Sequence, residues 1–325
     1  MKNIAVLTVL VIISGVYSYA QENEKIYCFS LGPQFGFVYG QAKEYVYSVP
    51  GDTKNDLLSE LLWDTKPVFY YGIRAEFSRI DLMEAPGFFS SFSFKAGFPA
   101  DSGVMEDRDW QSIENSNLTR FSRHTNRTNV FIKMDVSVGA SFPVESLFYL
   151  KPFLGGSWMH FTFSGRNGYG IYAREKSPGT DTYFPINDNP IKHNFSGEKV
   201  IRYQQDWLLL AIGFSAGTKI FYPFSFDISF QISPLTYCVS TDNHYGRNTV
   251  FKDFTSFGLF LEPSFKMSYV VKPAELSLGL SYRYIGKTKG KSYINEKNTG
   301  FSLGKNKAGA GLSMWDYNLL VSFRL

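Results

Sequence analysis

The run V-F-I-K-M-D-V-S-V-G at residues 130–139 determines the kind of fold that this sequence can adopt. Its aliphatic residues recur at every second position, and most of the positions between them carry polar residues or glycine. A period of two is typical of a β-strand that has one apolar face and one polar face. The run therefore predicts a strand.

The same alternation recurs along most of the chain, which has 325 residues and an unusually high aromatic content of 18%. Further alternating runs occupy residues 71–78, 92–98, 226–233, 257–269, 276–284 and 317–325. Because none of these runs has the period of an amphipathic helix, we expect an all-β protein.

The polar faces of these strands indicate where the apolar faces lie. They carry several charged residues mixed with glycine and serine, namely Arg74, Glu76, Lys95, Lys133, Asp135, Glu262, Lys266 and Arg283. A soluble sandwich or lipocalin-like barrel, which remains the alternative, would pack its apolar faces inward. Charged faces suit a wet lumen, and faces of Phe, Leu and Ile suit lipid. The pattern therefore favours a transmembrane β-barrel.

Short and long breaks between the runs predict the topology. Short turns are expected at residues 81–87, 143–146, 222–224 and 272–275, and long polar loops at 49–59, 100–128, 175–199, 242–253 and 292–308. This rhythm fits a single ten-stranded, antiparallel, up-and-down barrel with short periplasmic turns and long outer loops. The last run continues to the final residue, as a strand that closes the barrel should, because lipid cannot satisfy an open edge.

The N-terminal residues predict export. A positive start, an apolar core at residues 4–16 and small residues before position 21 form a signal peptide at 1–20, and the barrel domain then covers 21–325. An N-terminal anchor is the alternative, but the run is shorter than the ~20 residues a helix needs to span a bilayer. The two cysteines do not form a disulfide framework. The net charge of +4 is spread along the chain and argues neither for nor against nucleic acid, but the sequence has no basic stripe with interleaved aromatics, so we expect no nucleic-acid partner.

Two acidic segments follow alternating runs and are the candidates for chemistry. Asp107 and Asp109 lie in M-E-D-R-D-W at residues 105–110, and Asp242 and His244 lie in S-T-D-N-H at 240–244. We expect both segments in outer loops, displayed rather than buried, and facing each other across the barrel mouth. Residues at i and i+2 of an extended segment point the same way, so the two aspartates can share one water or proton.

These four residues could activate a water molecule. Asp242 would orient His244, His244 would take a proton from water, and the acid pair would hold the water or the developing oxyanion. Solvated loop charge or a weak calcium contact is the alternative reading of the acid pair. His160, which has no acidic neighbour in sequence, and His193 belong to no other catalytic motif, and we expect no metal site.

The chain resembles the omptins, a family of outer-membrane proteases. Their motif V-D-x-D-W followed by S-R-H is similar to residues 106–110 and 122–124, and their D-x-H-Y is similar to 242–245. Further matches are G-Q-A-K-E at 40–44, L-W at 62–63 and R-N-G-Y-G-I-Y at 166–172. The motifs occur in the family's order from about residue 27 onward.

The resemblance implies an endopeptidase that cleaves peptides or proteins at or near basic residues, with its active site outside the cell. Asp107, Asp109, Asp242 and His244 would be catalytic. Glu44 matches one of two acids that hold the basic substrate side chain, but Ser240 replaces the other. Strict specificity for two successive basic residues is therefore in question.

The resemblance also implies a lipopolysaccharide requirement, with no other cofactor. Omptins bind this lipid through basic residues on the outer face, where this chain instead has His160 and Asp206. Two further hypotheses remain at this point, an inactive barrel that acts as an adhesin or structural protein, and a small pore.

Overall fold

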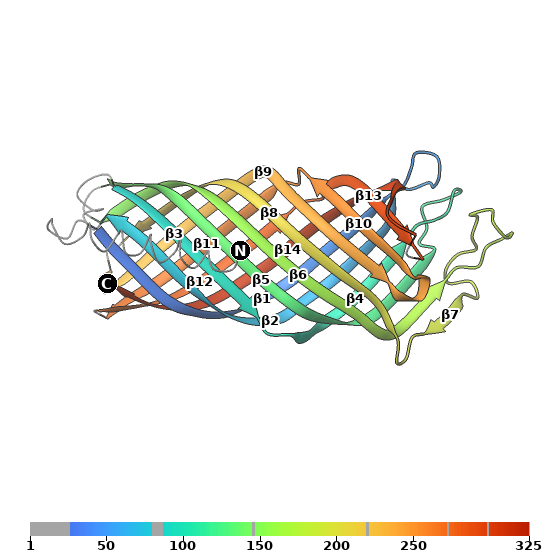
Figure 1. The fold of residues 1–325 in the computed structure, drawn as a ribbon, viewed down its shortest axis with the longest axis horizontal. Coiled ribbons are helices and arrows are strands. Elements are labelled where there is room, and N and C mark those ends of the chain that lie inside the picture. Colours follow the sequence, from blue (N-terminus) through green and yellow to red (C-terminus); the bar gives the residue numbers. More distant parts are fainter. Residues whose placement is uncertain are drawn as a thin grey trace.

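The computed structural model describes residues 27–79, 87–144, 147–218, 221–271, 273–297 and 299–324, and the expected signal peptide lies outside them. The described chain is almost entirely β-strand and forms a long barrel (Figure 1). No helix among these residues has the length and apolar character needed to cross a membrane. The expected turn at residues 81–87 also falls almost wholly outside the described part.

The strands are β1 (Tyr27–Tyr47), β2 (Leu57–Arg79), β3 (Gly87–Gly97), β4 (Ala100–Asp109), β5 (Arg120–Val144), β6 (Phe148–Tyr172), β7 (Ile191–Asn194), β8 (Lys199–Thr218), β9 (Phe224–His244), β10 (Thr249–Ser256), β11 (Phe260–Val271), β12 (Ala274–Ile285), β13 (Lys289–Glu296) and β14 (Ser302–Arg324). A single 3₁₀ turn, η1 (Tyr245–Arg247), accompanies them in the described residues.

The barrel is closed, because β14 pairs in antiparallel register with β1 and with β12 and β13. In three cases two successive strands together cross the barrel wall once and are separated only by a few residues that are not in strand. These pairs are β3 with β4, β10 with β11 and β12 with β13. The short β7 extends a loop beside β6. The fourteen strands of the described residues therefore form ten passes, which confirms the predicted ten-stranded barrel. Closure leaves no open edge to desolvate.

Several predicted outer loops are wrong in extent. Residues 100–109 and 120–128 belong to β4 and β5, and β9 and β10 leave only residues 245–248 between them. The strands continue past the apolar belt, and segments such as residues 106–109 are polar on both faces, so the apolar alternation disappears there. Backbone pairing, which the sequence pattern does not record, carries the strands onward.

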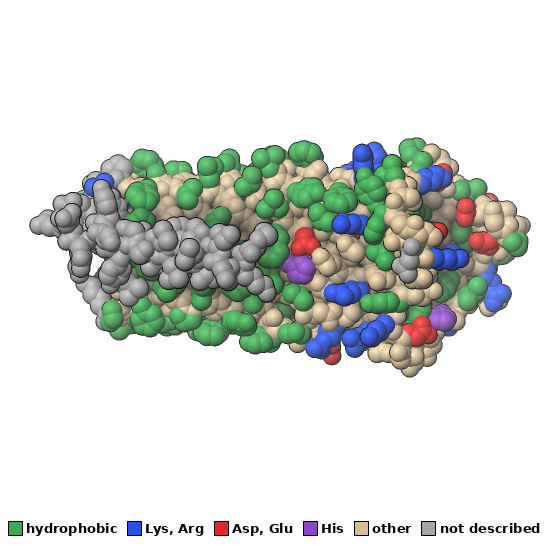
Figure 2. Space-filling model, viewed as in Figure 1, with side chains coloured by type: hydrophobic (Ala, Val, Ile, Leu, Met, Phe, Trp, Pro, Cys, Tyr) green, Lys and Arg blue, Asp and Glu red, His purple; other side chains and the backbone are tan. Residues whose placement is uncertain are grey.

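The outside of the barrel has two distinct halves. Exposed apolar side chains such as Leu154, Ile212 and Leu278 lie on the half that contains β3, β11 and β12. Figure 2 shows hydrophobic side chains over that half and charged side chains over the half that contains β4, β10 and β13. An apolar outer belt is what a lipid-facing barrel surface requires. We call the charged half the rim half.

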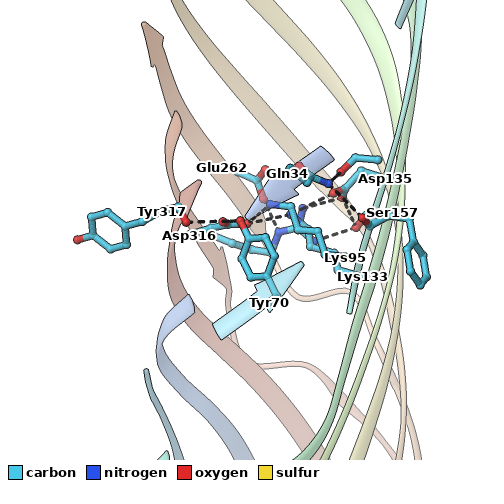
Figure 3. A network of polar contacts seen from close by, with 12 residues as sticks. Gln34, Tyr70, Lys95, Lys133, Asp135, Ser157, Glu262, Asp316 and Tyr317 are labelled. Carbon is cyan, nitrogen blue, oxygen red and sulfur yellow. Dashed lines mark hydrogen bonds and ion pairs between the residues drawn. The ribbon is translucent and has the colours of Figure 1, made fainter. Parts of the chain in front are cut away.

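A network of buried ion pairs crosses the lumen (Figure 3). Lys95 Nζ lies 2.5 Å from Asp316 Oδ2, and Lys133 Nζ lies 3.1 Å from Asp135 Oδ2. Arg283 on the opposite wall contacts both Asp135 and Glu262. We call these residues the lumenal network. It borders a polar cavity of about 230 Å³ and confirms the prediction that charged faces point inward.

Inside the rim half the lumen holds an apolar core, which the sequence pattern did not predict. Buried aromatic residues and methionines pack between the walls there, and Trp63 stacks on Tyr203 and Phe163 at centroid distances of 5.4 and 5.7 Å. This apolar core forms a solid layer inside the barrel, which places a rigid, poorly solvated floor beneath the rim.

Candidate active site

The aspartate pair ends strand β4 rather than lying in a displayed loop. Asp109 is buried and Asp107 is half-buried, so the prediction of exposure is wrong. β4 pairs with β2 on one side and with β5 on the other, which sets Asp107 opposite Leu61 and Ser122. The alternation of the strand sends both aspartates to the same face.

Charges on the opposite face of β4 explain how so polar a segment forms a strand. Arg108 Nη2 lies 2.6 Å from Glu106 Oε2, and Arg123 on the neighbouring β5 lies 3.9 Å from the same carboxylate group. Cross-strand and same-face pairs of opposite charge stabilise a solvent-facing sheet surface. The aspartates on the other face are thereby held inward.

Burial and mutual repulsion set the proton affinity of the pair. Burial raises the pKa of Asp107 to about 7, and the neighbouring charge of Asp109 contributes to the same shift. Burial also raises the pKa of Asp109. Ser59 on β2 donates a hydrogen bond of 3.3 Å to Asp107 Oδ1 and favours its charged form. The pair can therefore hold one proton near neutral pH.

The histidine and its aspartate end strand β9. His244 Nε2 lies 2.5 Å from Asp242 Oδ2, and the imidazole packs edge-on against Phe251 of β10. Asp242 is 1% exposed. Burial lowers the pKa of His244, but the charge and hydrogen bond of Asp242 outweigh burial and leave the pKa above 6.5. The hydrogen bond also fixes the ring and leaves Nδ1 free to meet a substrate or water.

The two segments act on each other electrostatically across the barrel mouth. The charge of His244 lowers the pKa of Asp107, and Asp107 raises that of His244. Arg247 in η1 also lowers the pKa of both groups. The structure therefore brings the four predicted site residues to one place. A base opposite an acid pair at a partly dry site can deprotonate a water molecule.

Glu44 and Ser240 lie beside this group. Glu44 on β1 is 3% exposed, and its Oε2 has no hydrogen-bond partner. Burial raises its pKa well above 4.5, and the charges of Asp242 and Asp253 raise it further. Ser240 on β9 is buried and donates a hydrogen bond to Asp253. The described residues contain no cluster suited to a metal ion.

Sequence reasoning missed Ser59, Asp253 and the role of His124. His124 is 2% exposed, accepts or donates a 2.9 Å hydrogen bond at Nε2 with Ser122 Oγ, and has its Nδ1 2.5 Å from the carbonyl oxygen of Asn167. Its contacts join β5 to Asn167 of β6, and Ser122 lies opposite Asp107 in the β4–β5 register. Only the register between strands could have revealed that Ser59, Asp253 and Asn167 lie near these residues.

His160 has an acidic neighbour after all, on the adjacent strand. Its Nδ1 lies 2.7 Å from Asp206 Oδ1, and Gln204 Nε2 donates a 2.7 Å hydrogen bond to Asp206 Oδ2. The register of β6 with β8 places the two residues directly opposite. His160 is six residues from the exposed Leu154 and Asp206 is two residues from the exposed Leu208, so the pair shares the outward face of its strands and lies away from the site.

The fold and site together define an outer-membrane β-barrel that carries a buried acid–histidine group at its rim. A model of the Omptin family matches residues 25–325. The chain is 23% identical to the plasminogen activator of Yersinia pestis over 331 residues, covering 99% of this chain and 98% of that protein. The crystal structure of the outer membrane protease OmpT from Escherichia coli superposes with a TM-score of 0.78 at 18% identity, covering 92% of this chain and 97% of that one.

The chain belongs to the Omptin family. This membership places it in a class of outer-membrane proteases and agrees with the resemblance drawn from the sequence motifs.

Proposed function

We propose that this protein is an outer-membrane endopeptidase that hydrolyses peptide bonds at or near basic residues, with its site facing the outside of the cell. The observation that carries the proposal is the 2.5 Å contact of His244 with Asp242 opposite the acid pair of β4. The charged rim half suits an aqueous exterior, and the apolar belt suits the bilayer below it.

The proposed reaction uses water as the nucleophile. His244 takes one proton from the water, whose oxygen attacks the peptide carbonyl carbon, and Asp242 stabilises the resulting imidazolium. Asp107 and Asp109 hold the water and share a proton near the developing oxyanion. The tetrahedral intermediate then expels the amine, which receives the proton from His244. The aromatic layer beneath keeps bulk water from the base of the site.

Cleavage of quenched peptides tests the proposed activity. The mature chain, refolded in detergent, should cleave peptides that contain Arg-Arg, Lys-Arg or a single Arg faster than a peptide of the same length with a neutral site. Buried carboxylates such as Glu44 favour a cationic side chain. A folded, strand-rich barrel that cleaves none of these peptides would instead support an adhesin or structural role.

The rate should depend on pH in a direction that the site specifies. His244 accepts a proton only when neutral, and its pKa lies above 6.5, so kcat/KM should rise with pH through a midpoint above that value. Loss of the proton that Asp107, whose pKa is about 7, shares with Asp109 acts in the opposite direction and limits the rise at higher pH, because that proton lies near the developing oxyanion.

Replacing Asp242 with asparagine removes the charge that raises the pKa of His244, so Asp242→Asn should move the midpoint of this profile to lower pH and reduce kcat. A pH–rate profile of both proteins checks this. An unchanged midpoint in the variant would show that another group controls the rise.

We propose that lipopolysaccharide is the lipid partner of this barrel. The peptidase activity should depend on this lipid less strongly than it would if basic residues occupied the positions of His160 and Asp206. Asp206 places a carboxylate beside His160 on the outer surface, and a carboxylate repels the phosphates of this lipid. The peptide assay run with and without lipopolysaccharide measures the dependence directly.

A further inference from the structure

The buried side chains beside the catalytic group include one more acid than the motif comparison provides. Asp253 on β10 is 2% exposed and lies directly opposite Ser240 in the β9–β10 register. Ser240 Oγ donates a hydrogen bond of 3.2 Å to Asp253 Oδ2. A carboxylate therefore sits one strand away from the position where the family's second pocket acid would be.

Two carboxylate oxygens beside the catalytic group are buried and lack a close hydrogen-bond donor, namely Glu44 Oε2 and Asp253 Oδ1. Ser292 on the neighbouring β13 lies opposite Asp253 and favours its charged form. No ion pair within the described part of the chain involves either residue. A buried carboxylate without a counter-charge is costly, so its presence points to a cation that binds there from outside the chain.

The two acids act on one another and on the catalytic group. Burial and the charge of Asp253 both raise the pKa of Glu44, while burial raises that of Asp253 to about 6. Positive charge brought between them would relieve this repulsion. The described residues offer no group of three or more metal ligands, and two carboxylates suit an organic cation.

A basic substrate side chain fits these requirements. A guanidinium presents five N–H donors in a planar fork and can bind the free oxygens of two carboxylates at once. An ammonium is a compact charge and would satisfy fewer of these acceptors, so arginine should be favoured over lysine. Ser240 and Asp242 are two residues apart on β9, and the charge of Asp242 raises the pKa of Glu44, so the acids adjoin the catalytic group.

We infer that Asp253 is a specificity-determining residue that forms, together with Glu44, the pocket for the basic side chain next to the bond cleaved. The acid absent at Ser240 is supplied by the neighbouring strand. This inference rests on the proposed peptidase function, and it extends that function by naming an arginine-selective pocket with a residue that the family motif does not include.

Asp253→Asn tests the inference with little change of shape. The variant should lower kcat/KM about 10²-fold for a peptide with arginine at the cleavage site and leave the matched glutamine peptide almost unaffected, because only a cation loses its counter-charge. The ratio between the two peptides is the readout. A ratio equal to that of the unaltered protein, or an equal loss on both peptides, would overturn the inference.

The matched control transfers the carboxylate from position 253 on β10 to position 240 on β9. The double variant Ser240→Asp with Asp253→Asn keeps the number of carboxylates and should recover most of the arginine preference. Failure of the double variant, alongside a folded barrel by its resistance to heat, would show that Asp253 does not act through its charge in this pocket.

Ligand binding separates this inference from the peptidase proposal. The His244→Ala protein, which cannot use its base, should bind argininamide, and adding Asp253→Asn should weaken that binding about 10²-fold. Equal binding by both proteins would refute the pocket even if peptides are cleaved. If no peptide is cleaved but this difference is found, the pocket stands and the peptidase proposal fails.

Discussion

Replacing His244 with alanine should lower kcat for the preferred peptide by about 10³-fold, within the range that a general base contributes. The imidazole is hydrogen-bonded to the buried carboxylate of Asp242, whose charge raises the pKa of His244 above 6.5. Asp242 would remain but could not reach the water in its place. Initial rates with a quenched arginine peptide, measured above pH 8, give the comparison.

His193→Ala is the matched control for this change. His193 lies on the short strand β7, is exposed, and is 3.9 Å from Glu198 in the loop that follows. Its loss should therefore leave kcat unaltered. Both proteins should remain folded barrels that resist heat. Activity within tenfold of the unaltered protein after loss of His244 would remove the histidine from the mechanism and leave the acid pair as the site to examine.

Replacing Asp316 with alanine should destabilise the barrel by about 3–5 kcal/mol, the usual cost of removing one partner of a buried ion pair. Asp316 is 2% exposed, contacts Lys95 at 2.5 Å and accepts a hydrogen bond of 2.5 Å from Tyr70. Lys95 has no other ion-pair partner in the described residues, so its charge would stay buried and uncompensated. Denaturant unfolding in detergent, followed by tryptophan fluorescence, measures the loss.

Asp101→Ala controls for removal of a carboxylate from an ion pair. Asp101 pairs with Arg127 at 3.2 Å, but its side chain is 72% exposed, and such pairs contribute little because water screens them. Its unfolding free energy should stay within about 1 kcal/mol of the unaltered protein. Equal destabilisation by both substitutions would contradict a structural role for the lumenal network.

The barrel could be predicted because lipid imposes a simple pattern on the strands. Residues 130–139 alternate since one face meets the bilayer and the other meets Lys95 and its neighbours inside. Above the belt that constraint ends. Glu106 and Arg108 point out to solvent while Asp107 and Asp109 point in, so the sequence there is polar on both faces and was read as a loop.

The candidate site was predictable only where its residues share one strand. Asp107 with Asp109, and Asp242 with His244, are two residues apart and form recognisable motifs. Asp253 beside Ser240, and Asp206 beside His160, are joined by pairing between strands. Strand register depends on the whole closed ring, so a pattern read along the chain does not reveal these partners.

The lumenal network also has a consequence for the cell that carries this protein. Side chains from β3, β5, β11, β12 and β14 meet in the middle of the barrel, and the aromatic layer lies above them. A solute would have to break several buried ion pairs to pass. We therefore expect each copy to be electrically silent, so that many copies could be displayed without making the outer membrane permeable to ions, detergents or antibiotics.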